Sequence, residues 1–314
     1  TSMKILVTGG AGFIGSHLCE KVLEQENEVI CLDNFFTGSK KNVKFLEKFK
    51  SFKIIEHDIT EPIDISVDQI YNLACPASPK YYQEDPVKTI KTNVHGAINM
   101  LDLAMNNNAK ILQASTSEIY GNPTIHPQHE NYHGSVNPIG PRACYDEGKR
   151  ASETLFFDYH RQYGIDISIA RIFNTYGPRM EINDGRVISN FFAQAINNSP
   201  MTIYGDGNHS RSFCYIDDLV DGLIRLMHSS ISEPINLGNP SEVSILELAK
   251  EIKEISGSSS QIVFNELPVD DPLKRKPDIK KAKKLLKWEP HISRSEGLLK
   301  TYGYYSTLIN NLNS

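Results

Sequence analysis

Short apolar runs alternate with longer segments of helical period over the first half of the chain. Strand-like runs occupy 4–7, 28–32, 52–56, 69–73, 110–114 and 167–171, and helical patterns occupy 12–25, 89–106 and 145–163. Alternation of this kind favours a parallel sheet with helices on both faces. The sequence therefore predicts an α/β fold of the Rossmann type, a doubly wound parallel sheet with its ligand crevice at the carboxyl ends of the strands.

The pattern loosens after Pro178. The sequence then predicts a helix over 187–197, a strand over 201–204, a turn over 205–208 and helices over 216–229, 245–255, 280–287 and 296–308. Ser244 and Glu247 have the spacing of a capping box at the start of the 245–255 helix. We expect a smaller C-terminal α/β lobe built from 178–212 and 241–314, while 213–240 joins 3–177 in the larger domain.

The composition is that of an ordinary globular protein, with 39% hydrophobic residues, 23% charged residues and a net charge of −5. A negative net charge argues against a nucleic-acid partner, and no apolar run approaches the roughly 20 residues that cross a bilayer. Five scattered cysteines without ligand spacing suit a reducing compartment and indicate no metal site. We therefore expect a cytoplasmic protein without membrane contact, unless a membrane anchor precedes the sequence as given.

Residues 7–15 read Val-Thr-Gly-Gly-Ala-Gly-Phe-Ile-Gly, which has the glycine spacing of a dinucleotide-binding fingerprint. Gly10 and Gly12 let the backbone turn tightly and approach a pyrophosphate, and Gly15 lets the helix pack close to the strand. The helix N-terminus then offers free N–H groups to the phosphates. The spacing alone is weak evidence, but here it follows a strand and opens a helix, as a dinucleotide site requires.

Asp33 comes directly after the second predicted strand and decides between two cofactors. A carboxylate at this position accepts hydrogen bonds from the adenosine ribose hydroxyls and repels a 2′-phosphate. The alternative is that Asp33 only begins the loop Asn-Phe-Phe-Thr-Gly that follows it. Together with the glycines, it favours NAD over NADP.

Tyr145 and Lys149 form a YxxxK pair on the helix predicted over 145–163. Positions i and i+4 share one helical face, so the phenol and the ammonium point into the same space. A free phenol titrates near ~10, and we expect the Lys149 charge, together with a positive nicotinamide ring, to lower the pKa of Tyr145. Tyr145 can then remove the proton from a substrate hydroxyl while hydride leaves the same carbon.

Thr116, Ser117 and Glu118 follow the strand predicted over 110–114. Because strand carboxyl ends face the crevice of a doubly wound fold, we expect these three side chains to line it. The alternative is that they form a simple polar exit from strand to loop. Their place just before the YxxxK helix favours a role in the site.

Together, the glycine fingerprint, the Thr-Ser-Glu exit and the YxxxK pair resemble an extended short-chain dehydrogenase/reductase acting on nucleotide sugars. Within that superfamily, five segments resemble the UDP-glucuronate decarboxylase (UDP-xylose synthase) family, namely 72–79, 88–93, 140–150, 171–180 and 271–278. The resemblance runs from about Lys4 to Glu289, nearly the whole chain. One departure is Cys75, where relatives often have Ser.

The resemblance implies catalysis by transient oxidation. NAD⁺ would oxidise the sugar C4 hydroxyl, the C5 carboxylate would leave as CO₂ because it then lies β to a ketone, and returning hydride would give UDP-xylose. Related 4,6-dehydratases carry Asp where this chain has Ser117, and related epimerases usually lack Glu118. The runner-up functions are a C4-epimerase or a dehydratase, and a third is a non-catalytic NAD-binding scaffold, which would not need Tyr145, Lys149, Glu118 or Arg275.

The same resemblance implies roles for individual residues. The catalytic group comprises Tyr145, Lys149, Glu118, Ser117, Thr116 and Arg275. The NAD-binding group comprises Gly9, Gly12, Phe13, Ile14, Gly15, Asp33, Asn34, Phe36, Thr37, Gly38, Asp58, Ile59, Leu73, Thr92, Tyr145 and Lys149. The group that binds the nucleotide sugar comprises Lys91, Asn174, Arg186, Arg211 and Arg275, and guanidinium groups suit a diphosphate through paired donors.

The resemblance also gives the domains and the assembly a function. NAD would bind the domain of 3–177 and 213–240, and the UDP-sugar would bind the lobe of 178–212 and 241–314. The helices predicted over 89–106 and 145–163 carry apolar stripes. In the resembling proteins the corresponding pair forms a four-helix bundle across a twofold axis, so we expect a homodimer, and isologous pairing of this kind is the commonest oligomer.

Overall fold

A parallel sheet forms the base of the molecule in the computed structural model, which describes residues 2–268 and 275–314. Within those residues the sheet has seven strands in the order β11-β6-β5-β4-β1-β2-β3. Their bounds are β1 (Lys4–Thr8), β2 (Glu28–Asp33), β3 (Phe52–Glu56), β4 (Gln69–Asn72), β5 (Lys110–Thr116), β6 (Ile167–Ile172) and β11 (Pro234–Leu237). The predicted Rossmann-type fold is confirmed, and the strand order reverses between β1 and β4, where such folds bind their ligands.

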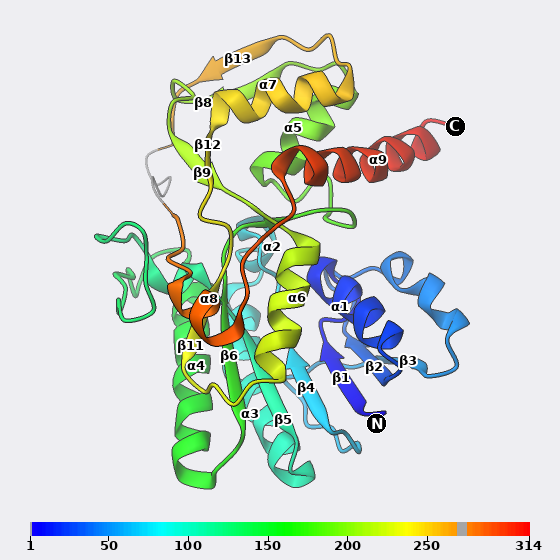
Figure 1. Ribbon diagram of the computed structural model, residues 1–314, viewed down its shortest axis with the longest axis vertical. Coiled ribbons are helices and arrows are strands. Elements are labelled where there is room, and N and C mark those ends of the chain that lie inside the picture. Colours follow the sequence, from blue (N-terminus) through cyan, green and yellow to red (C-terminus); the bar gives the residue numbers. More distant parts are fainter. Residues whose placement is uncertain (1, 269–274) are drawn as a thin grey trace.

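The alternation of side chains in the strands builds a core on each face of the sheet. Ile5 and Val7 of β1 belong to the core that contains α1 (Phe13–Glu24) and α6 (Ile216–Met227). Leu6, between them, belongs to the core that contains α3 (Pro86–Asn107) and α4 (Ala143–Tyr163). Successive strand residues point to opposite faces, and each buried aliphatic side chain contributes about 1.5–3 kcal/mol. Figure 1 shows α1 and α6 in front of the sheet.

Helix α3 begins three residues before the predicted 89–106 segment. Pro86 occupies its first turn, where the missing N–H costs no hydrogen bond. The side chain of Asp85 caps the helix by accepting a hydrogen bond of 3.1 Å from the Lys88 N–H. The helix ends at Asn108, which has a left-handed φ of 49°. The Asp85 cap and Pro86 fix the N-terminal end of α3, which lies at the carboxyl edge of the sheet.

A second layer lies above that edge in Figure 1. It contains α5 (Val187–Ile196), α7 (Ile245–Ser256) and α9 (Arg294–Leu312), together with two short strand pairs. The parallel pair is β8 (Met201–Tyr204) with β13 (Ile262–Asn265), and the antiparallel pair is β9 (Ser210–Ser212) with β12 (Glu242–Ser244). Ser244 accepts a hydrogen bond of 3.1 Å from the Glu247 N–H, so the predicted cap of α7 is confirmed.

The sequence pattern missed several short elements. They are η1 (Lys40–Asn42), η2 (Lys44–Lys48), α2 (Pro79–Tyr82), η3 (Ser117–Tyr120), β7 (Thr175–Tyr176) and β10 (Cys214–Tyr215), with β7 parallel to β10. Two to five residues are too few to establish a period. Among the residues that the structure describes, no helix combines the length and apolar composition needed to cross a membrane.

The C-terminal segment does not stay in the upper layer, contrary to the predicted lobe of 241–314. Helix α8 (Lys280–Leu286) lies beside β11 at the edge of the sheet (Figure 1). Trp288 is fully buried, donates a hydrogen bond of 2.9 Å to the Asp218 carbonyl and packs on Gly222 of α6. The physical reason is that Ala282 and Leu286 give α8 an apolar side, while its lysines face solvent.

Candidate active site

A cavity of about 1100 Å³ runs along the carboxyl ends of the sheet strands. It brings together nearly all of the predicted site residues from both layers. Those that line it are Gly9, Gly12, Phe13, Ile14, Gly15, Asp33, Asn34, Phe36, Thr37, Gly38, Asp58, Ile59, Leu73, Thr92, Thr116, Ser117, Glu118, Tyr145, Lys149, Asn174, Arg186, Arg211 and Arg275. The topology explains this gathering, because parallel strands all deliver their following loops to one edge.

The glycine turn after β1 brings the start of α1 against the strand end. Gly9 has φ +66°, a conformation that residues with side chains rarely adopt. A Cβ atom on Gly15 would lie 2.1 Å from the Gly9 carbonyl oxygen, so only glycine fits there. The close approach leaves the first N–H groups of α1 directed at the cavity, and this arrangement suits a pyrophosphate.

Asp33 is fixed at the next strand end with its carboxylate toward the cavity. Its two oxygens accept hydrogen bonds of 3.0 Å from the Ala11 N–H and 2.8 Å from the Phe35 N–H. Burial raises the pKa of Asp33, while the bonds from the backbone act against that rise. A Cβ atom on Gly38 would lie 2.6 Å from the Asp33 Oδ2 atom, so the glycine keeps the carboxylate accessible.

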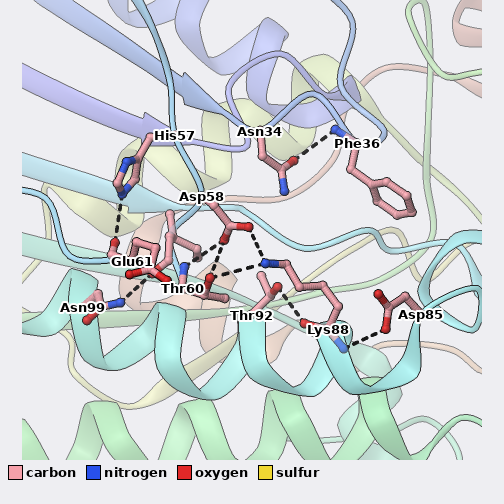
Figure 2. A network of polar contacts seen from close by, with 11 residues as sticks. Asn34, Phe36, His57, Asp58, Thr60, Glu61, Asp85, Lys88, Thr92 and Asn99 are labelled. Atoms are coloured by element: carbon pink, nitrogen blue, oxygen red, sulfur yellow. Dashed lines mark hydrogen bonds and ion pairs between the residues drawn. The ribbon is translucent and has the colours of Figure 1, made fainter.

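A polar network joins the loop after β3 to the start of α3, as Figure 2 shows. The Lys88 ammonium forms an ion pair with Asp58, and the Thr60 hydroxyl donates to the same carboxylate at 2.8 Å. Burial raises the pKa of Asp58, but the hydrogen bonds from Lys88 and Thr60 outweigh it, so the pKa is lowered. Thr92, one turn after Lys88, donates to the Lys88 carbonyl at 2.8 Å. This network fixes the cavity wall next to Asp58.

Tyr145 and Lys149 lie on one side of α4, as the YxxxK spacing predicts. The Lys149 Nζ atom is 5.7 Å from the centre of the Tyr145 ring and donates to the Ala114 carbonyl at 2.9 Å. Burial raises the pKa of Tyr145 well above its usual value, and a hydrogen bond with Thr116 acts in the opposite direction. The predicted fall in this pKa requires a positive nicotinamide ring beside Tyr145 as well as Lys149, and it stays a prediction.

Glu118 and Arg275 form an ion pair across 157 positions of sequence. The Arg275 NH1 group donates to the Glu118 Oε1 atom at 2.5 Å, and NH2 donates to the Gly121 carbonyl at 2.6 Å. Thr116 caps the short helix that carries Glu118 by accepting from the Glu118 N–H at 3.1 Å. Residues 271–274 of the resembling segment 271–278 lie outside the described residues.

Gln128 explains how Arg275 reaches this position. The Gln128 N–H donates to the Lys276 carbonyl at 2.9 Å, and the Asp278 N–H donates to the Gln128 carbonyl at 2.8 Å. The Gln128 side chain also accepts from the Lys276 N–H at 3.0 Å. These contacts make the backbone after Arg275 act like a short parallel strand beside Gln128, and Gln128 itself is fully buried.

A buried ion pair that the sequence did not suggest holds α4 against the sheet. Arg171 of β6 donates to both carboxylate oxygens of Glu153 on α4, at 3.1 and 2.7 Å. The Ser115 hydroxyl donates to the same carboxylate at 2.5 Å. Removal of one partner of a buried ion pair of this kind destabilises the fold by about 3–5 kcal/mol, because the other charge is left buried and unpaired. The pair therefore fixes the helix that carries Tyr145 and Lys149.

One predicted substrate contact does not line the cavity, and some lining residues were missed. Lys91 is exposed on α3, and it is turned about 100° around the helix from its neighbour Thr92, which lines the cavity. Lys88 lines the cavity instead, and so do Arg142 and Arg179. Arg142 precedes Tyr145 by one helical turn and lies within the resembling segment 140–150, which is the signal that could have identified it.

Among residues 2–268 and 275–314, no three side chains of His, Cys, Asp or Glu gather in a way that could hold a metal ion. Charged side chains on the described cavity wall form ion pairs with one another, as Asp58 does with Lys88 and Glu118 with Arg275.

Comparison with known proteins identifies the family. A family profile described as GDP-mannose 4,6 dehydratase matches residues 6–301. UDP-glucuronic acid decarboxylase 3 of Arabidopsis thaliana is 59% identical over 298 residues, which cover 95% of this chain and 87% of that protein. UDP-glucuronic acid decarboxylase 1 of Xenopus tropicalis is 55% identical over 302 residues, which cover 96% of this chain and 72% of that protein.

The fold is shared with solved enzymes of nucleotide sugars. A UDP-glucuronic acid 4-epimerase from Bacillus cereus, solved with UDP-glucuronic acid and NAD, superposes with a TM-score of 0.86. It is 31% identical, and the match covers 98% of this chain and 100% of that one. The similarity to the Arabidopsis and Xenopus proteins is thus much higher than the similarity to this epimerase.

Proposed function

This chain belongs to the GDP-mannose 4,6-dehydratase family and, within it, to the UDP-glucuronic acid decarboxylases, and on that premise we propose that it converts UDP-glucuronate to UDP-xylose and CO₂. The sugar is oxidised at C4, loses the carboxylate of C5 as CO₂ because that group then lies β to a ketone, and is reduced again at C4. The observation that carries the proposal is the Glu118–Arg275 ion pair in the same cavity as Tyr145 and Lys149.

The cofactor is NAD, and the residues of the cavity fit it. The glycine turn before α1 leaves room for a pyrophosphate, and the fixed carboxylate of Asp33 suits the two ribose hydroxyls of an adenosine. When bound, NAD⁺ supplies a hydride acceptor for C4 and, after CO₂ has left, the hydride that reduces the ketone. Asn34, Phe36, Thr37, Gly38, Asp58, Ile59, Leu73 and Thr92 line the same part of the cavity and complete the proposed cofactor site.

Tyr145 acts as the base for the C4 hydroxyl in this proposal. Because burial raises its pKa, the phenol keeps its own proton until a substrate hydroxyl and a positive charge are close by. The Lys149 ammonium and the Thr116 hydroxyl then stabilise the phenolate as it forms. Burial lowers the pKa of Lys149, while its hydrogen bond to the Ala114 carbonyl fixes the ammonium beside the Tyr145 ring.

Glu118 and Arg275 act at C5. Arg275 can hold the departing carboxylate through paired N–H donors, and its bond to Glu118 keeps the guanidinium oriented. After CO₂ leaves, C5 needs a proton, which the same pair can provide or relay. Ser117, beside Glu118, is a poor general acid, so it does not favour loss of the C6 oxygen by dehydration.

The UDP moiety is proposed to bind Asn174, at the carboxyl end of β6, together with Arg186 and Arg211, which line the cavity from the upper layer. Arg186 is oriented by its ion pair with Asp184, at 2.7 Å. On this proposal 3–177 with 213–240 binds NAD, and 178–212 with 241–314 binds the UDP-sugar, apart from α8, which packs on the sheet.

The decisive experiment is incubation of the chain with UDP-glucuronate and NAD⁺, followed by NMR. We expect UDP-xylose and CO₂. UDP-galacturonate without CO₂ would instead indicate a C4-epimerase. The absence of any turnover, with both ligands bound, would favour a non-catalytic NAD-binding scaffold.

A homodimer is part of the proposal. Val87, Ile90 and Met105 are exposed apolar residues on α3, and Tyr163 is exposed at the end of α4. Because α3 and α4 pack side by side, a second copy could cover both helices in a four-helix bundle across a twofold axis. Light scattering at micromolar concentration should report about twice the mass of one chain, and a monomer would contradict the bundle. The cytoplasmic location predicted from the scattered cysteines stays a prediction.

A further inference from the structure

Two segments that are far apart in sequence meet over the cavity. Residues 76–81 follow β4, residues 181–186 precede α5, and nearly all of both segments line the cavity. Three side chains of the first segment donate hydrogen bonds to the second. They are Ser78 Oγ to the Asp184 carbonyl at 2.6 Å, Lys80 Nζ to the Asn183 carbonyl at 2.9 Å, and Tyr81 OH to Glu181 Oε1 at 2.5 Å. We call these three contacts the clasp.

The residue after Tyr81 touches the proposed catalytic base. The ring of Tyr82 stacks on the ring of Tyr145, with 4.6 Å between centroids and 8° between planes. Tyr82 is fully buried, and its hydroxyl has no hydrogen-bond partner within the described part of the chain. The Thr89 hydroxyl donates to the Tyr82 carbonyl at 2.7 Å, so the end of α2 is attached to α3. Helix α2 is thus held by α3 at one end and by the clasp on its outer side.

The loop that carries α2 starts from a strained residue. Cys75 has φ 148°, a conformation that residues with side chains rarely adopt and that persists only when surrounding contacts impose it. The clasp and the attachment of Tyr82 are among the contacts that hold this loop, together with the Cys144 thiol, which lies 3.8 Å from the Tyr82 carbonyl oxygen. The strain at Cys75 indicates that the position of α2 depends on the contacts that α2 and the residues beside it make with the rest of the chain.

We propose that Tyr81 is a positioning residue for the decarboxylation reaction, because its hydrogen bond to Glu181 holds α2 in the place where Tyr82 stacks on Tyr145. The inference rests on the proposed function, in which Tyr145 is the base. A hydrogen bond to a carboxylate is about twice as strong as one between neutral groups. Burial and the Glu181 carboxylate raise the pKa of Tyr81 to about 12, so the phenol remains a donor throughout the neutral range.

The Tyr81–Glu181 contact is the member of the clasp in which both the donor and the acceptor can be removed by substitution. Ser78 and Lys80 donate to main-chain carbonyls, which every residue type provides, so their acceptors cannot be removed. The Tyr81–Glu181 contact joins two side chains. Tyr81→Phe removes only the donor, Glu181→Leu removes the acceptor, and Glu181→Gln keeps an oxygen that can still accept.

The experiment measures hydride transfer in a single turnover of the full chain, at saturating UDP-glucuronate and NAD⁺, from absorbance at the NADH band. We expect Tyr81→Phe and Glu181→Leu each to slow the step by about 10-fold, which is the loss of one bond to a charged group. The double variant should be no slower than either single one, since both remove the same contact. Glu181→Gln should recover most of the rate.

Controls separate positioning from general damage. Glu233→Leu removes a carboxylate that accepts from Lys281 at 2.7 Å outside the cavity, and it should react like the native chain. UDP affinity by calorimetry and the thermal midpoint should change little in Tyr81→Phe, since Tyr81 acts on the alignment of the base and not on folding or nucleotide binding.

The outcomes are distinct for the two proposals. If the native chain forms NADH from UDP-glucuronate and Tyr81→Phe forms it equally fast, Tyr81 has no positioning role. The proposed role would also be wrong if the rate losses of the two single variants multiply in the double variant. If the native chain itself forms neither NADH nor CO₂, the proposed decarboxylase function is what fails.

Discussion

Two ion pairs line the cavity, and they are built differently. At the proposed sugar site, Glu118 and Arg275 come from segments 157 positions apart, and the side chains are 26% and 7% exposed. At the proposed adenosine site, Asp58 and Lys88 belong to a loop and a neighbouring helix, and the side chains are 30% and 41% exposed.

The difference in exposure predicts that the Glu118–Arg275 pair affects the reaction rate, whereas the Asp58–Lys88 pair affects cofactor affinity. Charges that are shielded from water interact strongly, whereas exposed charges are screened by solvent and salt. Tyr145 and Lys149 also lie at the proposed sugar site, where burial raises the pKa of the phenol and lowers the pKa of the ammonium. We therefore expect substitutions at the proposed sugar site to change rates by large factors and those at the proposed adenosine site to change affinity moderately.

The largest effect is expected from Tyr145→Phe. Removal of the hydroxyl leaves no base for the C4 proton, so hydride transfer and every later step should be slower by about 10⁴-fold. Single-turnover absorbance at the NADH band measures this directly. Calorimetry with UDP and NAD⁺ is the control, since the ring that lines the cavity remains. Near-native NADH formation would show that another group is the base.

The second prediction tests the Glu118–Arg275 ion pair. Glu118→Ala and Arg275→Ala should each slow CO₂ release by about 10²–10⁴-fold, and they should slow hydride transfer less, because the pair acts at C5 and Tyr145 acts at C4. CO₂ capture beside NADH absorbance separates the two steps.

The exposed pair provides the comparison. Lys88→Met breaks the ion pair with Asp58, and an exposed pair contributes about 0.2–1 kcal/mol, so NAD⁺ affinity should fall by less than about 5-fold. If Glu118→Ala and Arg275→Ala bind substrate and release CO₂ as fast as the native chain, their assigned roles are wrong. A larger effect for Lys88→Met than for Arg275→Ala would reverse the comparison itself.

Asp33 should govern the choice of cofactor. The double variant Asp33→Ala, Asn34→Arg should bind NAD⁺ about 10–100-fold more weakly, because bonds to a charged group are lost, and should narrow the gap to NADP⁺. Asp33→Asn keeps only one of the two oxygens that accept from the Ala11 and Phe35 N–H groups, so it controls for part of the damage to the turn. Titration of the native chain with both dinucleotides is the measurement, and equal affinities would contradict the role of Asp33.

The smallest effect is a pH dependence of stability at Asp146, next to Tyr145. Burial, with the charge of Glu118, raises the pKa of Asp146 to about 7 from 3.8, against the opposing charges of Arg275 and Arg142. An acid with a raised folded-state pKa stabilises the fold below pH 3.8, and this stability is lost as pH rises to about 7. Asp146→Asn stays neutral, so its thermal midpoint should exceed that of the native chain by more at pH 8 than at pH 5.

The increase in that difference should be at least about 2 °C for a chain of this size. Differential scanning calorimetry of both proteins at the two pH values provides the comparison. A difference that is the same at pH 5 and pH 8 would mean that Asp146 has an ordinary pKa in the folded chain.

The sequence by itself determined the features that depend on local periodicity. The short apolar run at 4–7 predicted a strand, and strand geometry places Ile5 and Val7 on one face of β1 and Leu6 on the other. The i, i+4 spacing placed Tyr145 and Lys149 on one side of α4, and the glycine spacing fixed the turn before α1. Such features are encoded within a few neighbouring residues, where backbone geometry leaves few alternatives.

The tertiary structure decided the features that depend on contacts between distant segments. Only the pairing of Gln128 with the backbone after Arg275 shows why that guanidinium meets Glu118. The pKa of Tyr145 depends on how much water the fold removes, and only the packing of α3 decides that Lys88 lines the cavity and Lys91 does not. The Tyr81–Glu181 contact joins two segments 100 positions apart. Side-chain packing across such separations is set by the whole core, and no local pattern contains it.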